Sequence, residues 1–366
     1  MKEVTIIGPI PPPIHGESLA LDNLIKSEEI NNSFSINVLN TNRKNVSNAG
    51  KFSFRKILQD INIIYKSYKQ KSDIIYISIS QTKLGLLRDL IIIKLVRRKS
   101  SKIITHLHGN NLGNTIDKLT PLEKKITKHT FGLIDTAIVL GEKLVPNYRN
   151  MASHVDVVSN GISKDYISIA ELSDANLKRA KSKTLKLLYL SNLIESKGFL
   201  LATKAVIDLV KEGYKVELVL AGAIHDYDKY EEFKELLQKE NCKEKIKYIG
   251  VVTGKYKKDL LLSSDIMVLP TNYKIEGQPI SIIEGMAAGL PIVSTNVGCI
   301  DDMIQNNGIL LEYPTVSDLK VSIKKLIEEE KLRMEYSDNS RQHFEKNYSL
   351  DNYIARIKDI FNDVSR

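Results

Sequence analysis

The stretch from Asp265 to Val297 constrains the fold of this chain more than any other. It begins with a predicted buried strand, Ile266 to Leu269, which a polar loop follows. Apolar residues then recur at helical spacing: Ile280, Ile283, Met286 and Ala287. Gly289-Leu290-Pro291 ends this helix, and Ile292 to Ser294 is a second apolar strand. The order strand, loop, helix, strand predicts a parallel α/β sheet.

Two carboxylates lie in this stretch, eight positions apart. Glu276 is in the loop before the helix, and Glu284 is on the second turn of the helix. Ligands of open α/β sheets bind beyond the carboxyl ends of the strands, where a helix N-terminus suits a phosphate. A carboxylate at that edge must then serve another group, and sugar hydroxyls are the obvious candidates. The alternative is that Glu276 only favours the helix dipole and that Glu284 lies on a solvated helix face.

Strands alternate with helices along the whole chain, and 366 residues are too many for one ordinary core. We therefore predict two doubly wound parallel sheets that face each other across a cleft, with domains at 1–165 and 183–347. A polar linker is expected between Ser163 and Lys183, and a last helix at 351–366. The predicted strands are Val4–Ile7, Ile36–Asn40, Asp73–Ser80, Lys102–Leu107, Thr136–Leu140, Val155–Val158, Leu185–Leu190, Val216–Leu220, Ile246–Ile249, Ile266–Leu269, Ile292–Ser294 and Gly308–Leu311.

Three features of the first half are candidates for function. The loop from Gly8 to Ser18 joins the first strand to the first helix, so Gly16 could let its backbone approach an anion. A rigid proline-rich turn explains the same loop. His108 stands at a strand end beside a glycine, although a lone histidine is more often structural. The basic helix from Lys83 to Lys99 fits a membrane surface or a core-facing helix with a basic outer side.

In the second half, Lys197 follows the strand Leu185–Leu190, near the start of a helix. A lysine there suits a diphosphate as a point charge, although a surface lysine is the commoner explanation. Gly222 and Gly250 end the next two strands, and small residues there leave room for a base or a ribose.

The composition indicates an ordinary soluble protein with an anionic partner. The net charge is +9, and charged residues make up 27% of the chain. Two cysteines and the lack of zinc-ligand spacing favour a reducing compartment. No signal peptide and no run of roughly 20 apolar residues is visible, which predicts a cytoplasmic location. Nucleic acid is not expected as a partner, because no basic stripe carries interleaved aromatic residues.

The segment from Glu276 to Pro291 resembles the Glu-x7-Glu signature of the family 4 retaining glycosyltransferases, also known as glycosyl transferases group 1. His15-Gly16, His108-Gly109 and Lys197-Gly198 resemble further family motifs in the expected order. The resemblance implies the GT-B architecture of two Rossmann-like domains, with the last helix crossing back to the N-terminal domain. Asn192 stands where many members have arginine, and Gln278-Pro279 also departs from the family pattern, which leaves the phosphate contacts and the donor sugar open.

The resemblance also implies roles for individual residues. Glu284 would bind the ribose, Glu276 the transferred sugar, and Lys197 the diphosphate. Glu276 and His108 form the predicted catalytic set. The predicted donor-binding residues are Gly16, Asn192, Lys197, Gly222, Gly277, Gln278, Pro279, Ile280, Ser281 and Glu284. The predicted acceptor-side residues are His15, Gln81 and Arg88.

The predicted reaction is a metal-independent, cofactor-free transfer of a hexose-type sugar from a nucleotide-diphosphate sugar, with retention at the anomeric carbon. The expected acceptor is a glycan or a lipid-linked glycan. The expected process is bacterial surface polysaccharide synthesis (O-antigen or other lipopolysaccharide, capsule or exopolysaccharide) at the inner face of the cytoplasmic membrane. Two alternatives remain open. One is a nucleotide-sugar epimerase of the same architecture, and the other is a non-catalytic glycan-binding module.

Overall fold

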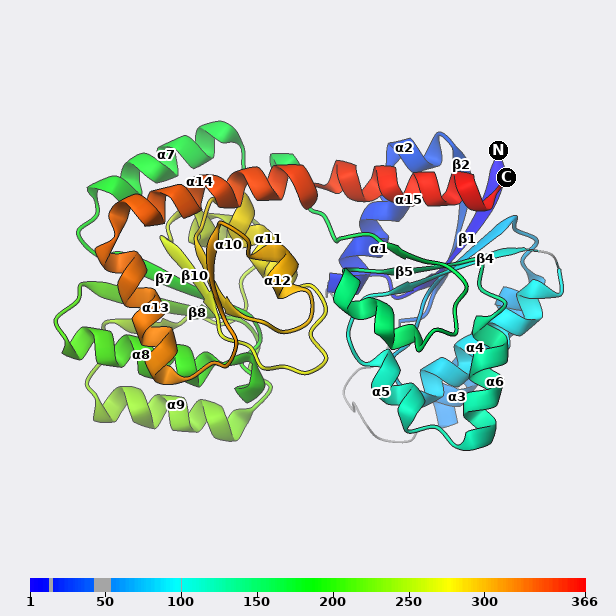
Figure 1. Ribbon diagram of the computed structural model, residues 1–366, viewed down its shortest axis with the longest axis horizontal. Helices are drawn as coiled ribbons and strands as arrows, with labels where there is room; N and C mark the ends of the chain where they lie inside the picture. The colour runs from blue at the N-terminus through cyan, green and yellow to red at the C-terminus, as the bar shows by residue number, and fades with distance from the viewer. Residues whose placement is uncertain (13–15, 43–53, 100) are drawn as a thin grey trace. The chain divides into compact units, whose positions relative to one another are not determined.

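The computed structural model describes residues 1–12, 16–42, 54–99 and 101–366. The chain divides into two compact units (Figure 1). The N-terminal unit contains Met1–Asn160 and Leu350–Arg366, and the C-terminal unit contains Gly161–Ser349. Each unit is an α/β structure built on six parallel strands, as the alternating sequence pattern predicts.

The sheet of the N-terminal unit has the strand order β2-β1-β3-β4-β5-β6, and every pair of neighbours is parallel. The strands are β1 (Lys2–Gly8), β2 (Phe34–Asn40), β3 (Ile74–Ser78), β4 (Lys102–Leu107), β5 (Thr136–Val139) and β6 (Val155–Val157). The helices are α1 (Gly16–Lys26), α2 (Glu28–Asn31), α3 (Phe54–Lys69), α4 (Lys83–Arg97), α5 (Leu112–Asp117), α6 (Pro121–Phe131), η1 (Glu142–Tyr148) and α15 (Leu350–Val364). All five residues of β3 are buried, as expected for a central strand covered on both faces.

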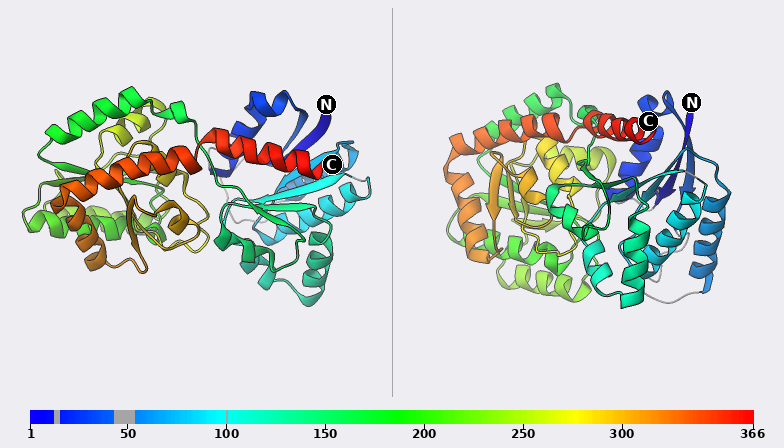
Figure 2. Two further views of the ribbon diagram at one scale, coloured as in Figure 1. Left: turned by 45° about the horizontal axis from the view of Figure 1, so that its top comes forward. Right: turned by 45° about the vertical axis from the view of Figure 1, so that its right-hand side comes forward.

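The last helix, α15, belongs to the N-terminal unit although it is the last element of the chain. In each view it lies beside α2 and β1 (Figures 1 and 2). Its buried side chains join the core formed by β1, β3 and β4, and the ring of Phe361 packs edge-on against Phe34 at 5.4 Å. Lys358 also pairs with Glu29 of α2 at 2.9 Å. Helix α15 therefore covers one face of this sheet.

The sheet of the C-terminal unit has the strand order β12-β11-β10-β7-β8-β9, again with parallel neighbours. The strands are β7 (Leu185–Leu190), β8 (Val216–Ala221), β9 (Ile246–Tyr248), β10 (Ile266–Leu269), β11 (Ile292–Thr295) and β12 (Gly308–Leu311). The helices are η2 (Lys164–Tyr166), α7 (Ile169–Lys181), η3 (Glu195–Lys197), α8 (Phe199–Lys211), α9 (Tyr227–Lys239), α10 (Gly254–Leu262), α11 (Ile280–Ala287), α12 (Ile300–Met303), α13 (Val316–Glu328) and α14 (Glu330–Asn347). Strand order reverses between β7 and β10, which is the order of a doubly wound nucleotide-binding sheet.

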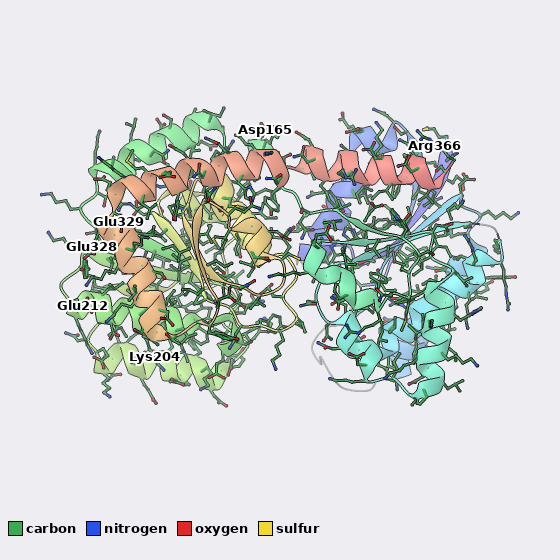
Figure 3. All side chains as sticks on the ribbon, in the orientation of Figure 1. Asp165, Lys204, Glu212, Glu328, Glu329 and Arg366 are labelled. Atoms are coloured by element: carbon green, nitrogen blue, oxygen red, sulfur yellow. The ribbon has the colours of Figure 1, made fainter. Side chains whose placement is uncertain are left out.

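Helices cover both faces of this sheet. Helices α8, α9 and α13 pack together on one side, and α7, α10, α11 and α14 pack on the other (Figure 1). Glu212, labelled in Figure 3, directly follows α8. It pairs with Lys320 at 2.9 Å and with Lys324 at 3.3 Å, both on α13. These ion pairs are exposed and contribute little, so apolar burial between the helices and the sheet supplies most of the stability.

The polar segment expected as a linker between Ser163 and Lys183, with two helical turns in part of it, contains the longer helix α7 of 13 residues. Ser168 and Glu171 form a reciprocal capping box at its start, and Glu171 pairs with Lys258 of α10 at 2.5 Å. Only Ala175 of this helix is fully buried, so its sequence lacks the apolar stripe that marks a packed helix. Along the chain, the boundary between the two units falls between Asn160 and Gly161, before the predicted linker.

Candidate active site

The best-formed candidate site lies at the reversal point of the C-terminal sheet. Strands β7 and β10 are neighbours there, and the register pairs Leu188 with Met267. The loop Ser191–Gly198 follows β7, and the loop Pro270–Pro279 follows β10, so both leave the same edge of the sheet. In a doubly wound fold the chains diverge at this point and leave a crevice beyond the carboxyl ends of the strands.

Glu276 and Lys197 meet at this edge, from the two loops. Lys197 Nζ lies 3.1 Å from Glu276 Oε2, and both side chains are largely buried, with 17% and 10% of their area exposed. The contact lacks the geometry of a hydrogen bond, so Oε2 has no hydrogen-bond partner among the described residues. Lys197 Nζ also lies 5.2 Å from the ring centre of Tyr273. The site thus holds a buried carboxylate oxygen that can still accept a hydrogen bond.

The main chain fixes the Glu276 loop from two directions. Glu276 N–H donates to the carbonyl of Tyr273 at 2.9 Å, and Cys299 N–H donates to the carbonyl of Gly277 at 2.9 Å. Gly298 has φ +59°, and a Cβ added there would lie 2.4 Å from the carbonyl oxygen of Glu276. Gly298 is a close backbone contact of this loop that the sequence analysis did not single out. Its only signal was a glycine after an apolar strand, which does not reveal what it packs against.

Glu284 lies on α11 and has 10% of its side chain exposed. Its Oε1 accepts a hydrogen bond from Lys257 Nζ of α10. Burial raises the pKa of Glu284, and the charge of Lys257 opposes that rise. Tyr166 of η2 lies close by, with its ring centre 5.9 Å from Lys257 Nζ. Burial raises the pKa of Tyr166, and the charge of Glu284 raises it further. The buried hydroxyl of Tyr166 has no hydrogen-bond partner among the described residues.

The sequence analysis also missed Lys257 and Tyr166. No motif connects them with Glu284, since 27 and 118 positions separate them from it along the chain. Tertiary structure alone brings α10, η2 and α11 together.

The two ends of helix α11 differ in their hydrogen-bond partners. Pro279 directly precedes the helix and offers no side-chain cap, so no capping side chain covers the first N–H groups. At the other end, side chains of α7 and α14 donate hydrogen bonds to the last carbonyls. The pairs are Arg341 with Ala287 at 2.8 Å, Arg179 with Ala288 at 3.1 Å, Ser337 with Gly289 at 2.6 Å and Ser340 with Leu290 at 2.7 Å. The positive end of the helix is therefore the end that can receive an anion.

Asn192 and Gly222 lie on the adjoining loops after β7 and β8. Asn192 Oδ1 accepts a hydrogen bond from the N–H of Ala223 at 3.3 Å. Gly222 approaches the carbonyl of Ser191 so closely that a Cβ would lie 2.0 Å from that oxygen. These contacts join the two loops, and the donor-binding roles of both residues stay predictions. The remaining predicted donor residues, Gly277 to Ser281, lie between the Glu276 loop and the first turn of α11.

The predicted residues of the N-terminal unit gather at the carboxyl edge of its own sheet. Gly16 begins α1, and His15 lies outside the described residues. His108 follows β4, and its ring stacks on His106 with the ring centres 3.9 Å apart. His106 is fully buried, and burial followed by the effect of His108 holds its pKa well below the usual value. Tyr76 shares a hydrogen bond with His106 Nδ1.

Gln81 and Arg88 make their described contacts within the N-terminal unit. Gln81 Oε1 accepts from the N–H of Asn111 at 2.8 Å, which ties the loop after β3 to the loop after β4. Arg88 is 8% exposed and donates to Asp89 Oδ1 at 2.7 Å and to Ser80 Oγ at 2.8 Å. Helix α4 thus packs one side, including Arg88, into the core of its unit. The acceptor-side roles of both residues stay predictions.

A cavity of about 480 Å³ in the C-terminal unit does not lie at this edge. Lys186 and Asp265, which line it, stand at the amino ends of β7 and β10. Within the described part of the chain, no group of His, Cys, Asp or Glu side chains is arranged to hold a metal ion. Among the helices of the described residues, none has the length and apolar content to cross a bilayer.

Residues 173–343 match the family model described as Glycosyl transferases group 1. This segment runs from α7 to α14 and includes Glu276, Glu284 and Lys197. Over this region the chain is therefore similar to the group 1 glycosyltransferases.

Curated relatives support this placement at low identity. An uncharacterized glycosyltransferase of Methanocaldococcus jannaschii, MJ1069, is 26% identical over 279 residues, which are 73% of this chain and 69% of the relative. The capsular polysaccharide biosynthesis glycosyltransferase CapM of Staphylococcus aureus is 25% identical over 48% of this chain and 45% of its own. An N,N'-diacetylbacillosaminyl-diphospho-undecaprenol alpha-1,3-N-acetylgalactosaminyltransferase of Campylobacter jejuni is 33% identical over 29% of each chain.

Solved structures extend the similarity of fold to the whole chain. The crystal structure of Anabaena HepE in complex with UDP has a TM-score of 0.74, with 14% identity over 99% of this chain and 100% of the other. The GT-B fold class expected from the sequence, with two Rossmann-like parallel-sheet units, is thereby confirmed.

Proposed function

We propose that this protein is a retaining, family 4 glycosyltransferase that moves a hexose-type sugar from a nucleotide-diphosphate sugar to a glycan or lipid-linked acceptor. The observation that carries the proposal is the meeting of Glu276 and Lys197 beside the uncapped start of α11, at the reversal point of the sheet. The site combines a cation and a helix N-terminus for a diphosphate with a carboxylate for sugar hydroxyls.

The chemical task of such a site is to stabilise charge on the leaving group. The bond from the anomeric carbon to the diphosphate breaks, and its electron pair leaves with the diphosphate. A bond from that carbon to an acceptor oxygen forms on the same face of the sugar, and the acceptor hydroxyl gives its proton to the departing diphosphate oxygen. Negative charge grows on the departing diphosphate, where Lys197 and the N–H groups of α11 oppose it. Because these groups supply positive charge, we propose that the transfer needs no metal ion.

Donor binding changes the partners of the two central side chains. Without donor, Lys197 and Glu276 satisfy each other's charge. With donor, Lys197 would turn to the diphosphate, and Glu276 would accept hydroxyl hydrogens of the sugar through the oxygen that now has no hydrogen-bond donor. Glu284, which accepts a hydrogen bond from Lys257, would also accept the ribose hydroxyls.

We propose a uridine diphosphate sugar as the donor. HepE has been solved in complex with UDP and with UDP-glucose, and its fold matches this chain over nearly its whole length. The base would lie near Gly222, where Tyr248 at the end of β9 donates a hydrogen bond to the Gly222 carbonyl at 2.8 Å.

The proposed process is the assembly of a bacterial surface polysaccharide on the cytoplasmic side of the membrane. CapM is named for capsular polysaccharide biosynthesis, and the Campylobacter jejuni relative is named for an acceptor on diphospho-undecaprenol. By analogy, we propose a lipid-linked acceptor bound through the N-terminal unit, with His108, Gln81 and Arg88 near it or shaping its site.

A panel of nucleotide sugars tests the proposal. Binding to the folded state raises the melting temperature by mass action, so UDP-sugars should give the largest shift and GDP-sugars a smaller one. Turnover of the donor should survive EDTA and should fall at least a hundredfold in Glu276→Gln. Epimerised donor without an acceptor would favour the epimerase alternative, and binding without any turnover would favour a glycan-binding module.

A further inference from the structure

Helix α3 carries an apolar stripe that faces outward. Leu58, Ile61, Tyr65 and Tyr68 recur at spacings of three and four residues, which places them on one side of the helix. Their exposed fractions are 51%, 55%, 53% and 48%. Single exposed apolar side chains are common on soluble proteins, but a continuous row of four is not.

The neighbouring helices continue this apolar row. Helix α3 packs beside α4, and α4 packs beside α6, so the three lie side by side on one face of the N-terminal unit (Figures 1 and 2). Leu84 and Ile91 of α4 and Leu122 and Ile126 of α6 are also exposed, by 36–68%. We call the outer surface of α3, α4 and α6 the three-helix face.

The charge of the three-helix face is strongly positive. Among the residues of these helices whose side chains the structure describes, nine are Lys or Arg and three are Asp or Glu. Each of the three acidic residues already has a basic partner. The pairs are Asp60 with Arg88, Asp89 with Arg88, and Glu123 with Lys83. The acidic charge of these helices is thus neutralised internally, and the remaining lysines set the sign of the surface.

Lysines and tyrosines are placed together on this face. Lys69 Nζ lies 4.6 Å from the ring centre of Tyr65, and Lys99 Nζ lies 4.2 Å from that of Tyr68. Each ammonium group and phenol hydroxyl therefore stands at the edge of an apolar row. A helix that lies in a bilayer interface has this arrangement, with apolar side chains in the acyl region and cations and aromatic hydroxyls at the headgroups.

We propose that the three-helix face docks on an anionic lipid bilayer. A second copy of the chain would bring one basic face against another, which like-charge repulsion opposes. A nucleic acid would satisfy the lysines but would leave Leu58, Ile61 and the aliphatic residues of α4 and α6 without an apolar partner. This inference deepens the proposed function by naming a surface for the lipid side of the reaction. Its test measures binding alone and does not depend on transferase activity.

The experiment uses the full chain and vesicles of phosphatidylcholine with or without phosphatidylglycerol. We expect wild type to sediment with the anionic vesicles at low salt and to be released as the ionic strength rises. The double variant Ile61→Ser, Tyr65→Ser should lose at least tenfold in vesicle affinity. Lys66→Gln, Lys69→Gln should lose more than tenfold, since each lysine near an anionic surface is worth roughly a factor of five.

A matched control changes two equally exposed apolar residues of the C-terminal unit, Val321→Ser and Met334→Ser, which are 59% and 62% exposed. The control should bind vesicles as wild type does. All variants should melt within about 2 °C of wild type, because exposed side chains contribute little to stability. Donor turnover in solution should also be unchanged, which separates a failure of this inference from a failure of the proposed function.

Three results would overturn the inference. The first is a wild-type protein that stays in the supernatant with anionic vesicles at low salt. The second is vesicle binding that the α3 variants and the control reduce equally. The third is a concentration-dependent dimer, or binding to single-stranded nucleic acid, that only the α3 variants abolish, because the face would then serve another partner.

Discussion

Replacement of Gly298 by alanine should reduce turnover by displacing Glu276. The φ of Gly298 is +59°, and its added Cβ would lie 2.4 Å from the carbonyl oxygen of Glu276 and 2.5 Å from that of Gly277. A carbon and an oxygen that are not bonded do not approach this closely, so the loop must move by about 0.6 Å to restore even 3.0 Å. Because a displacement of about 1 Å at a reacting centre can cost on the order of a hundredfold, we expect a loss of roughly 10- to 100-fold.

Gly213 provides a matched control in the same unit. It follows α8 with φ +89°, and a Cβ added there would meet no atom within 4 Å. Gly213→Ala therefore carries the cost of a left-handed alanine, about 1–2 kcal/mol, without a clash. For a domain of this size we expect its melting temperature to fall by roughly 2–8 °C while turnover stays within twofold.

The assay is the initial rate of nucleoside diphosphate release from the donor that the nucleotide-sugar panel identifies, measured well below the melting temperature of each variant. Gly298→Ala should melt lower than Gly213→Ala and should show the larger kinetic loss. Equal turnover in the two alanine variants would refute the idea that the Gly298 contact positions Glu276.

Three further perturbations give distinct outcomes. Lys197→Met should lower turnover by roughly 10²–10³-fold, as loss of one charge-stabilising donor does, and should also lower the melting temperature, since the buried Glu276 carboxylate loses its ion-pair partner. Lys257→Met should destabilise the fold by about 1–3 kcal/mol at pH 8 in urea unfolding, since Glu284 loses its partner. Burial already raises the pKa of Glu284, and the variant should raise it further, so the folded state favours protonated Glu284. The loss of unfolding free energy in Lys257→Met should therefore shrink toward pH 5, and a constant or growing loss would contradict this account. Phe361→Ala should cost about 3–5 kcal/mol in the unfolding transition of the N-terminal unit and should leave the melting of the C-terminal unit unchanged.

The sequence predicted the strands well because their signal is local. The strands Lys102–Leu107 and Leu185–Leu190 have the same bounds in the structure as in the sequence pattern, since short apolar runs of this length bounded by polar residues are typical of buried strands. The full length of helix α7 was not predicted, because its stability comes from its capping box, its ion pair with α10 and the hydrogen bonds of Arg179, not from an apolar stripe.

The site was only partly predictable for a related reason. Glu276 and Glu284 lie within one motif, and Lys197 stands at a strand end that the fold class singles out. Lys257 has no such signal, because its pairing with Glu284 depends on how α10 and α11 pack. The burial of Arg88 and its pairing with Asp60 were not predictable either, since the sequence around a buried arginine can be the same as that around an exposed one. Partner choice between distant elements is a property of the tertiary structure.

The position of α15 sets the order in which the two units can be completed during synthesis. The core of the N-terminal unit includes Tyr353, Ile357 and Phe361, whereas the C-terminal unit is one continuous segment, Gly161–Ser349. The ribosome therefore finishes the second unit before the first can close. At about 5–20 residues per second, the roughly 190 intervening residues leave the apolar face of β1 and β3 uncovered for on the order of 10–40 s. Lys2 Nζ donates to the carbonyl of Ser365 at 2.6 Å, so a permuted chain in which residues 350–366 precede β1 would remove that delay and lower the demand for chaperones.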